Sequence, residues 1–351
     1  MSQNPAGLMS IDHLEFTVDS MASPTVKLFS TMGFSKSATN EDSGLYTQGQ
    51  VRFLVKSSND ENALSRRYFK SHGEGVSKIS FQVENVEKAL DITLKNGAKL
   101  VSDLKIEETP LGIFKTASIQ GFGDVVNEFV ERPQTQFRPG FQNLESDAGA
   151  NPLKTRISRI DHLTNNVPKG QMDHWVDFYK RTYGFIETRY FDIKGTKTGL
   201  NSKVVQLADN SIIIPINEPD REGGKSQIQE FLDVHKGPGV QHIALMTPDI
   251  ISTIGELRER AVRFLSVPAT YYEAIPNRPF KVTEDLKVLE KLNLLVDGDS
   301  DGYLLQIFSD TYVGPLFFEY IQRKNHWGFG NGNFQALFDA IERDQMERGY
   351  V

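Results

Sequence analysis

An internal repeat is the feature that most constrains how this chain can fold. "IDHLEFTV" (11–18) and "IDHLTNNV" (160–167) nearly coincide, and each precedes a helical stretch that ends in a similar phrase. Strand, helix and further strands, repeated as a set, predict an α+β chain of two tandem βαβββ-module domains. Other matched segments follow in the same order: 28–34 with 178–185, 73–90 with 237–254, and 126–132 with 316–323.

The two copies are separated by a stretch rich in Pro, Gly, Asn and Gln, residues 133–154. This composition is typical of a linker. A chain of 351 residues is long for one core and comfortable for two domains. We therefore predict an N-terminal domain at 1–135, a linker at 136–155 and a C-terminal domain at 156–351.

Composition excludes several classes of function. With no cysteine, disulfides, Cys-ligated zinc, iron–sulfur clusters and thiol nucleophiles are ruled out. The opening "MSQNPAGLMS" is neither basic nor apolar, and no apolar run approaches the roughly 18 residues that span a bilayer. A net charge of -7 and a pI of 5.6 give no electrostatic basis for nucleic-acid binding. We expect a cytoplasmic protein whose partner is a small molecule or another copy of the chain, with no membrane or nucleic acid.

The repeat aligns potential metal ligands in the two halves. The second half offers two imidazoles and a carboxylate: His162, His242 and Glu319. The aligned residues of the first half are His13, Lys78 and Glu128. Two imidazoles and a carboxylate hold a divalent metal, whereas a charged ammonium has no lone pair to donate. The alignment predicts a metal site in the second half and a degenerate, structural first half.

Each ligand also has an ordinary structural interpretation. A lone His in a strand is more often structural than metal-binding. Glu319, flanked by Phe318 and Tyr320, needs a partner if it is buried; a metal is one solution and Arg323 is another. Asp161 precedes His162 in a strand, so its side chain is expected on the opposite face with a structural role.

The remaining histidines give weaker signals. His72 and His235 lie in turn-like contexts and are predicted to be solvated. His174 falls in a helical stretch as a packing or surface residue, and His326 is assigned to the surface before a glycine loop. A two-His-one-carboxylate set without Cys favours Fe(II) or Mn(II) over Zn(II) and leaves about three positions open for a chelating substrate and dioxygen.

Several segments of the second half resemble the 4-hydroxyphenylpyruvate dioxygenase family of the vicinal oxygen chelate superfamily, whose paired βαβββ modules form open barrels. The resemblance covers residues 156–348, while the first 135 residues match loosely. It is carried by "IDHLTNNV", "TGLNSKVV", "PINEP", "KSQIQEFL", "GPGVQHIALMT", "LLQIF", "FFEYIQR" and "GFGNGNFQALFDAIE".

The resemblance implies Fe(II) held by His162, His242 and Glu319. It implies an arylpyruvate substrate whose 2-oxo acid chelates the metal. Reaction with O2 would then give oxidative decarboxylation, ring hydroxylation and side-chain migration, yielding homogentisate and CO2 in tyrosine catabolism. It also implies a homodimer or homotetramer.

The resemblance further assigns roles in the substrate pocket. A flat apolar slot with a few amide and hydroxyl groups suits an arylpyruvate with a phenol. The polar network that orients the substrate would consist of Ser202, Asn217, Gln241 and Gln306. The aromatic contacts would come from Phe308 and Phe334, which sandwich the ring, and from Phe329 and Phe338 at the mouth. Asn333 joins the substrate-binding set.

Two helices are predicted near this site. Ser226 and Gln229 fit an S-x-x-Q capping box and Gly237 a C-terminal stop, which indicates a helix covering the barrel near His242. After Asn333, a sensible N-cap, a second helix is expected. Its apolar face is Phe334, Leu337, Phe338 and Ile341, and its polar side is Asp339, Glu342, Arg343 and Asp344.

The glycines before the second helix, Gly328, Gly330 and Gly332, run G-x-G-x-G. They match neither the dinucleotide fingerprint nor a P-loop, because the spacing differs and no lysine follows. We interpret them as the flexible root of a C-terminal lid helix that excludes water from a reactive site. The alternative is a helix merely docked on the barrel.

Two alternative functions stay open at this stage. Hydroxymandelate synthase shares fold, ligands and substrate but oxidises the benzylic carbon; the "PIN" run (215–217) and Phe334 favour the homogentisate-forming type. The other alternative is a metal-free protein of the same superfamily that binds an aromatic ligand, which an intact ligand triad argues against.

Overall fold

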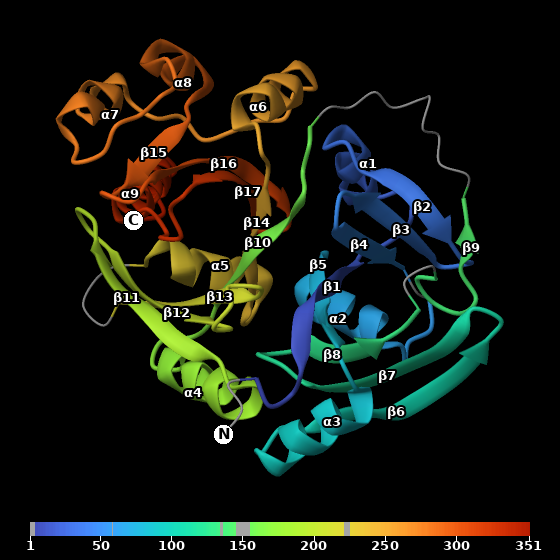
Figure 1. The fold of residues 1–351 in the computed structure, drawn as a ribbon. Coiled ribbons are helices and arrows are strands. Elements are labelled where there is room, and N and C mark those ends of the chain that lie inside the picture. Colours follow the sequence, from blue (N-terminus) through green and yellow to red (C-terminus); the bar gives the residue numbers. More distant parts are fainter. Residues whose placement is uncertain (1–3, 58, 134–135, 145–154, 221–224) are drawn as a thin grey trace.

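The computed structural model describes residues 4–57, 59–133, 136–144, 155–220 and 225–351. Two curved, mixed sheets lie side by side, one from each half of the chain (Figure 1). The first sheet has nine strands in the order β6-β7-β8-β5-β1-β4-β3-β2-β9, and the second has eight in the order β11-β12-β13-β10-β14-β17-β16-β15. The predicted α+β fold, with one βαβββ-type sheet from each half of the chain, is confirmed.

The first half contains β1 (Leu8–Thr17), α1 (Pro24–Thr31), β2 (Ser35–Thr39), β3 (Ser43–Gln48), β4 (Val51–Lys56), α2 (Leu64–His72), β5 (Gly75–Val83), α3 (Val86–Lys95), β6 (Leu100–Thr109), β7 (Gly112–Gln120), β8 (Val126–Glu131) and β9 (Gln142–Asn143). The second half contains β10 (Arg159–Asn166), α4 (Met172–Tyr183), β11 (Ile186–Lys194), β12 (Gly199–Gln206), β13 (Ile213–Pro219), α5 (Gln227–His235), β14 (Gly239–Met246), α6 (Ile250–Glu259), α7 (Ala269–Glu273), a 3-10 turn (Ile275–Asn277), α8 (Leu286–Leu292), β15 (Leu295–Gly298), β16 (Tyr303–Val313), β17 (Leu316–Lys324) and α9 (Asn331–Glu347).

Each half of the chain itself contains two copies of the βαβββ unit. Each sheet joins two βαβββ units, which meet along an antiparallel strand pair, β1 with β5 in one sheet and β10 with β14 in the other. The predicted linker begins as part of the first sheet, because Gln142 and Asn143 pair with β2. Residues 145–154 of that linker lie outside the described residues.

Helix α5 forms where its capping residues predicted. The backbone N–H of Gln229 donates to Ser226 Oγ at 3.5 Å. The Gln229 side chain donates to Asp233 instead of reaching back, so half of the capping box is formed. The left-handed C-cap is Lys236 (φ 60°), one residue before Gly237.

Helix α9 begins earlier than predicted. Its N-cap is Gly330, with φ 67°, and the N–H of Phe334 donates to the Gly330 carbonyl at 2.8 Å. Asn333 therefore lies in the first turn, fully buried, and its assignment as N-cap is wrong. The helix packs against β11 and β15, the two edge strands of the second sheet, and so closes the open side of that barrel.

One hydrophobic cluster runs through both halves and holds them together. Phe53 of the first half and Phe318 of the second lie 6.3 Å apart between ring centroids. The buried Asn127 side-chain amide donates to the Tyr183 hydroxyl at 2.8 Å across the same junction. Neither sheet therefore completes its core alone.

Two histidines predicted to be solvated are packed at this junction instead. His72 ends α2 and His235 ends α5, the equivalent helices of the two halves, and their rings stack at 4.4 Å. His72 lies 2.9 Å from Asp124 and 2.8 Å from the His235 carbonyl, while His235 Nε2 lies 2.9 Å from the Tyr68 hydroxyl. Burial lowers the pKa of His235 to about 4. His174 is exposed, as predicted.

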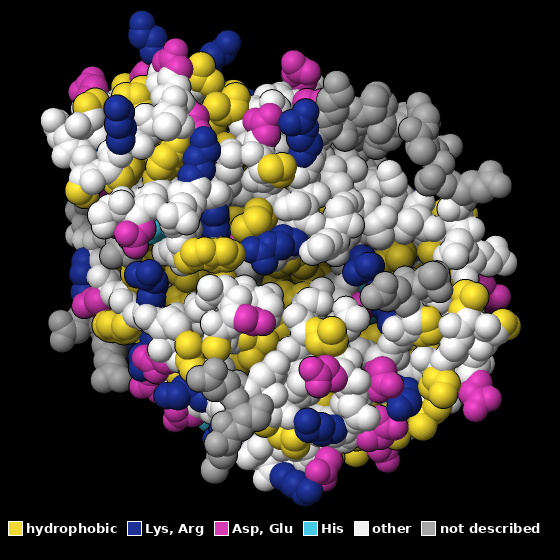
Figure 2. Space-filling view, in the orientation of Figure 1, with side chains coloured by type: hydrophobic (Ala, Val, Ile, Leu, Met, Phe, Trp, Pro, Cys, Tyr) yellow, Lys and Arg dark blue, Asp and Glu magenta, His cyan; other side chains and the backbone are white. Residues whose placement is uncertain are grey.

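Basic and acidic side chains are interspersed over the face seen in Figure 2. In the described part of the chain, no helix combines the length and apolarity needed to cross a bilayer.

The junction hydrogen bond yields a stability prediction. Tyr183→Phe leaves the buried Asn127 amide without its acceptor, which should lower the free energy of unfolding by about 1–3 kcal/mol. Urea unfolding followed by circular dichroism measures this. Tyr190→Phe is the matched control, because Tyr190 is 56% exposed and its hydroxyl donates to Asn201 away from the junction. Equal effects of the two substitutions would contradict a structural role for the junction bond.

Candidate metal centre

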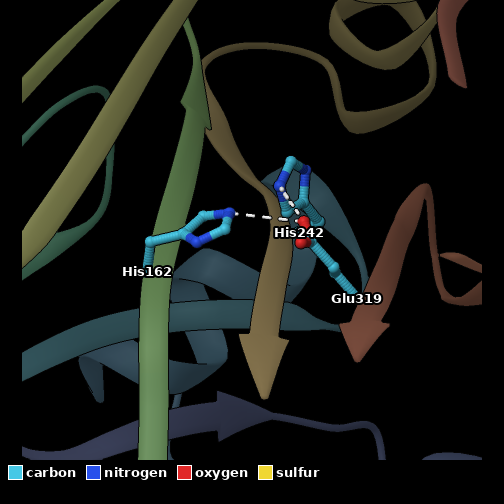
Figure 3. Close-up of side chains that lie close together, drawn as sticks. All are labelled: His162, His242 and Glu319. Atoms are coloured by element: carbon cyan, nitrogen blue, oxygen red, sulfur yellow. Dashed lines mark ion pairs between the residues drawn. The ribbon is translucent and has the colours of Figure 1, made fainter. Parts of the chain in front are cut away.

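Three adjacent strands bring the predicted ligands to one point. His162 lies on β10, His242 on β14 and Glu319 on β17, which are neighbours in the second sheet. The Nε2 atoms of His162 and His242 lie 3.3 and 3.5 Å from the same carboxylate oxygen, Glu319 Oε2 (Figure 3). All three side chains are buried, and one potential ligand atom from each lies within 4.8 Å of the others.

Each imidazole is oriented by the residue that precedes it. His162 Nδ1 lies 2.8 Å from Asp161 Oδ2, and His242 Nδ1 lies 3.1 Å from Gln241 Oε1. Both arrangements turn Nε2 towards Glu319, as metal-binding histidines require. Two imidazole nitrogens and a carboxylate oxygen converging in this way fit a divalent metal such as Fe(II).

Asp161 is not on the opposite face, contrary to the sequence expectation. The pairing of β10 with β14 shifts register between Ile160 and His162, and such a bulge re-aims side chains. Asp161 therefore contacts His162 and receives two hydrogen bonds from Arg323, at 2.8 and 2.7 Å. Arg323 is thus the ion-pair partner of Asp161, and Glu319 faces the histidines.

The surroundings of the site shift the pKa values of the two histidines in opposite directions. Burial opposes charge on His162, but the Glu319 and Asp161 carboxylates outweigh it and raise the pKa of His162 to about 9. Burial and the neighbouring His162 hold the pKa of His242 well below its ordinary value. Without a metal, a protonated His162 therefore balances the Glu319 charge near neutral pH.

In the first half, the aligned residues converge around cations. Lys78 Nζ lies 3.1 Å from Glu128 and 3.4 Å from Glu15, and Arg138 also pairs with Glu128. His13 is oriented by Asp12 at 2.8 Å, as His162 is by Asp161. Lys78 and Arg138 supply beside Glu128 the positive charge that a metal would supply beside Glu319.

A narrow cavity adjoins the three ligands. The predicted residues that line it are Ser202, Asn217, Gln306, Phe308, Phe329 and Phe334. Ser202 Oγ and Asn217 Oδ1 are buried, and neither has a hydrogen-bond partner among the described residues. These two oxygens are free to bind a polar ligand group.

Three other predicted residues surround the cavity without lining it. Gln241 lies behind it, between His242 and the Asn217 amide at 3.4 Å. The Asn333 amide contacts Gln306 at 3.2 Å. Phe338 packs in an apolar cluster between α9 and the sheet.

Sequence reasoning missed four residues that line the cavity: Thr164, Phe191, Val204 and Ile321. Thr164 Oγ1 lies 2.9 Å from His242 Nε2. Thr164 follows His162 by two positions on the same strand face, so the strand period alone would have found it. Phe191 gave no such signal, because its strand β11 is largely exposed.

Comparisons with known proteins agree with this geometry. One family model, described as "Hydroxyphenylpyruvate dioxygenase, HPPD, N-terminal", matches residues 2–138, so the first half carries a clearer family signal than its sequence had indicated. A second, "Glyoxalase/Bleomycin resistance protein/Dioxygenase superfamily", matches residues 159–274.

Full-length relatives and a solved structure extend the match. The chain is 39% identical to 4-hydroxyphenylpyruvate dioxygenase of Pseudomonas aeruginosa, covering 99% of this chain and 97% of the relative. It is 38% identical to Protein MelA of Shewanella colwelliana, with 99% of each covered. A triple mutant of 4-hydroxymandelate synthase from Streptomyces coelicolor aligns with TM-score 0.86 and 26% identity, covering 97% of this chain and 99% of that one.

Paired βαβββ sheets with a buried His-His-Glu cluster define a vicinal oxygen chelate enzyme. Within that superfamily, relatives named 4-hydroxyphenylpyruvate dioxygenase are 38–39% identical to this chain over nearly its whole length. The chain belongs to the 4-hydroxyphenylpyruvate dioxygenase family.

The raised pKa of His162 predicts pH-dependent metal uptake. The ring must lose its proton before Nε2 can bind a metal, and that proton is held up to a pKa of about 9. Apparent affinity for Fe(II) should therefore rise about tenfold per pH unit from pH 7 towards 9 and then level off. Anaerobic competition with a chelator measures this. An affinity independent of pH, or iron retained by His242→Ala, would contradict the site.

Proposed function

We propose that this enzyme converts 4-hydroxyphenylpyruvate and O2 into homogentisate and CO2. The observation that carries the proposal is the converging His162, His242 and Glu319 beside a cavity with aromatic walls and two unpaired buried oxygens. The relatives named 4-hydroxyphenylpyruvate dioxygenase, at 38–39% identity over 99% of the chain, support the same reaction.

We assign Fe(II) to the three ligands, with Asp161 and Gln241 holding the two imidazoles in register. When bound, the metal supplies an anchor for the 2-oxo acid and the redox chemistry with O2. The cytoplasmic location and the dimeric or tetrameric assembly implied by the family are part of this proposal, and light scattering of the purified protein tests the assembly.

We assign substrate orientation to the polar groups of the cavity. The Ser202 hydroxyl can donate or accept a hydrogen bond with the substrate, and Asn217 Oδ1 can accept one. Gln306 presents an amide held by Asn333. Phe308 and Phe334 provide flat apolar walls for the ring. Positioning is the protein's share of the catalysis, because a misplaced ring would be oxidised at the wrong carbon.

Helix α9 is proposed as the lid. The cavity has a volume of about 40 Å3, which is too little for an arylpyruvate. Phe334 and Leu337 of α9 form part of the wall, so moving α9 enlarges the space. A wider cleft of about 760 Å3 lies outside, bordered by α5 and the far part of α9, and reaches inwards to Gln241 and Phe317. Substrate would enter from this side.

Glu342 fastens the lid. It was predicted on the polar side of the helix, but it is 2% exposed. Its carboxylate accepts backbone N–H bonds from Thr196 (2.7 Å), Lys197 (3.1 Å) and Thr198 (2.7 Å), and one from the Thr198 hydroxyl at 2.7 Å. These donors lie in the β11–β12 hairpin, so the carboxylate ties α9 to the edge of the sheet.

The product distinguishes the proposed activity from hydroxymandelate synthesis. After anaerobic loading with Fe(II), addition of 4-hydroxyphenylpyruvate and O2 should give homogentisate and equimolar CO2, separated by chromatography. The expectation follows from the closer similarity to the dioxygenases. Formation of hydroxymandelate would contradict the proposed product and would mean that the pocket wall directs oxidation to the benzylic carbon. An iron-loaded enzyme without turnover would mean that the substrate is a different 2-oxo acid.

Removing the lid fastening should slow the reaction without unfolding the enzyme. Glu342→Ala should weaken docking of α9 by about 1.5–3 kcal/mol, since it deletes an acceptor of charge-assisted bonds. We expect lower kcat and faster proteolysis within α9. Asp339→Ala, an exposed position on the same helix outside the outer cleft, is the control and should behave like the wild type. Unchanged turnover in Glu342→Ala would refute the lid.

A further inference from the structure

Arg323 occupies a buried position between the metal site and the root of the lid. Its side chain is 5% exposed and makes four hydrogen bonds. Nε and Nη2 donate to the two oxygens of Asp161, at 2.8 and 2.7 Å. Nη1 donates to the backbone carbonyls of His326 (3.0 Å) and Gly328 (2.7 Å). One planar guanidinium therefore holds a carboxylate on one side and a loop on the other.

The two sides of Arg323 lead to two functional elements. Asp161 passes the constraint to His162 through the 2.8 Å contact with Nδ1. Gly328 lies two residues before Gly330, the N-cap of α9. Between them, Phe329 packs edge-on against His162 with ring centroids 5.2 Å apart. The loop that begins the lid thus rests on the same imidazole that Asp161 orients.

We propose that Arg323 is a positioning residue that couples the orientation of His162, through Asp161, to the docking of residues 326–330 and hence of α9. The inference rests on the proposed metal site and lid. A guanidinium suits this task because its rigid fork binds a carboxylate in two places and keeps further N–H donors in the same plane. A lysine would keep the charge but lose the fork.

The first half contains the same arrangement without the lid. Arg132 donates twice to Asp12, at 2.9 and 2.8 Å, and to the Gln136 carbonyl at 3.0 Å. Phe137 packs edge-on against His13 at 5.1 Å. The Asp–His–Arg cluster is therefore a repeated element of the fold, and by itself it does not imply a metal.

The halves differ in the residue after the phenylalanine. In the first half Arg138 follows Phe137 and turns into the site, where it pairs with Glu128. In the second half Gly330 follows Phe329, with φ 67° and a Cβ position only 3.0 Å from Gln306 Oε1. A side chain at that position would crowd Gln306 and would require a backbone conformation that L-residues rarely adopt, and the chain continues into α9. The coupling therefore operates only in the second half.

The test compares Arg323→Lys with the matched Arg132→Lys, using Co(II) as the probe for the metal site. Chelator competition gives the Co(II) affinity, and the visible spectrum of bound Co(II) reports the ligand geometry. Hydrogen exchange of residues 326–347 reports lid docking. We expect Arg323→Lys to weaken Co(II) binding about 10- to 100-fold, to change the spectrum and to increase exchange in this segment.

Arg132→Lys should lower the urea midpoint while Co(II) affinity, spectrum and exchange of the lid stay at wild-type values. Asp161→Asn, which keeps the shape of the side chain, should shift all three readouts in the same direction as Arg323→Lys. Wild-type Co(II) affinity in Arg323→Lys, or weakened affinity with unchanged exchange at 326–347, would overturn the coupling. A wild-type enzyme that binds Co(II) but makes no homogentisate from its Fe(II) form would refute the proposed reaction and leave this result standing.

Discussion

A carboxylate buried between two imidazoles is the constraint around which the second half is built. Glu319 sits in an apolar strand with a side chain only 3% exposed, where an unbalanced charge would be too costly to keep. A protonated His162 balances this charge, and a divalent metal at the proposed site would displace the proton and bind the ring nitrogen in its place. The first half solves the same problem permanently, with Lys78 and Arg138 beside Glu128. One duplicated architecture thus yields a cluster that could hold a metal in the second half and one closed by fixed cations in the first.

The sequence predicted the parts of this site that depend on local period and on duplication. His162, His242 and Glu319 were predicted because the repeat aligns them with His13, Lys78 and Glu128. Their strands β10, β14 and β17 are neighbours in the sheet, which brings the three side chains together. Asp161 was misplaced because a bulge changes the face of a strand residue, and no sequence pattern marked this bulge. His72 and His235 were missed as a pair because their contact joins helices 163 residues apart.

The proposed lid helix α9 was likewise predicted only where its features depend on local sequence. Its helical period was readable, and Leu337 and Phe338 are buried as predicted. Glu342 looked like a solvated residue because its partners, the N–H groups of 196–198, belong to a hairpin far away in the sequence. Contacts in the folded chain also explain why a glycine stands at position 330. Gly330 adopts a positive φ and leaves room for Gln306, which a phosphate-binding pattern would not require.

The contacts along α9 differ in what they cost to break, and this difference bears on how the proposed lid would open. At the root of α9, the buried Arg323 donates to the loop carbonyls and also forms a buried ion pair with Asp161. Separating such a buried pair is strongly destabilising, because it leaves a charge without its partner. At its far end, Arg348 pairs with Glu230 and Asp344 at the surface, where ion pairs contribute about 0–1 kcal/mol. Between them, Glu342 holds the hairpin through hydrogen bonds alone. For the proposed lid, opening would therefore cost least if the C-terminal end of α9 separated first and the helix swung about its glycine root. Such a motion would widen the outer cleft beside Gln241 while Asp161 and Arg323 keep His162 oriented towards Glu319.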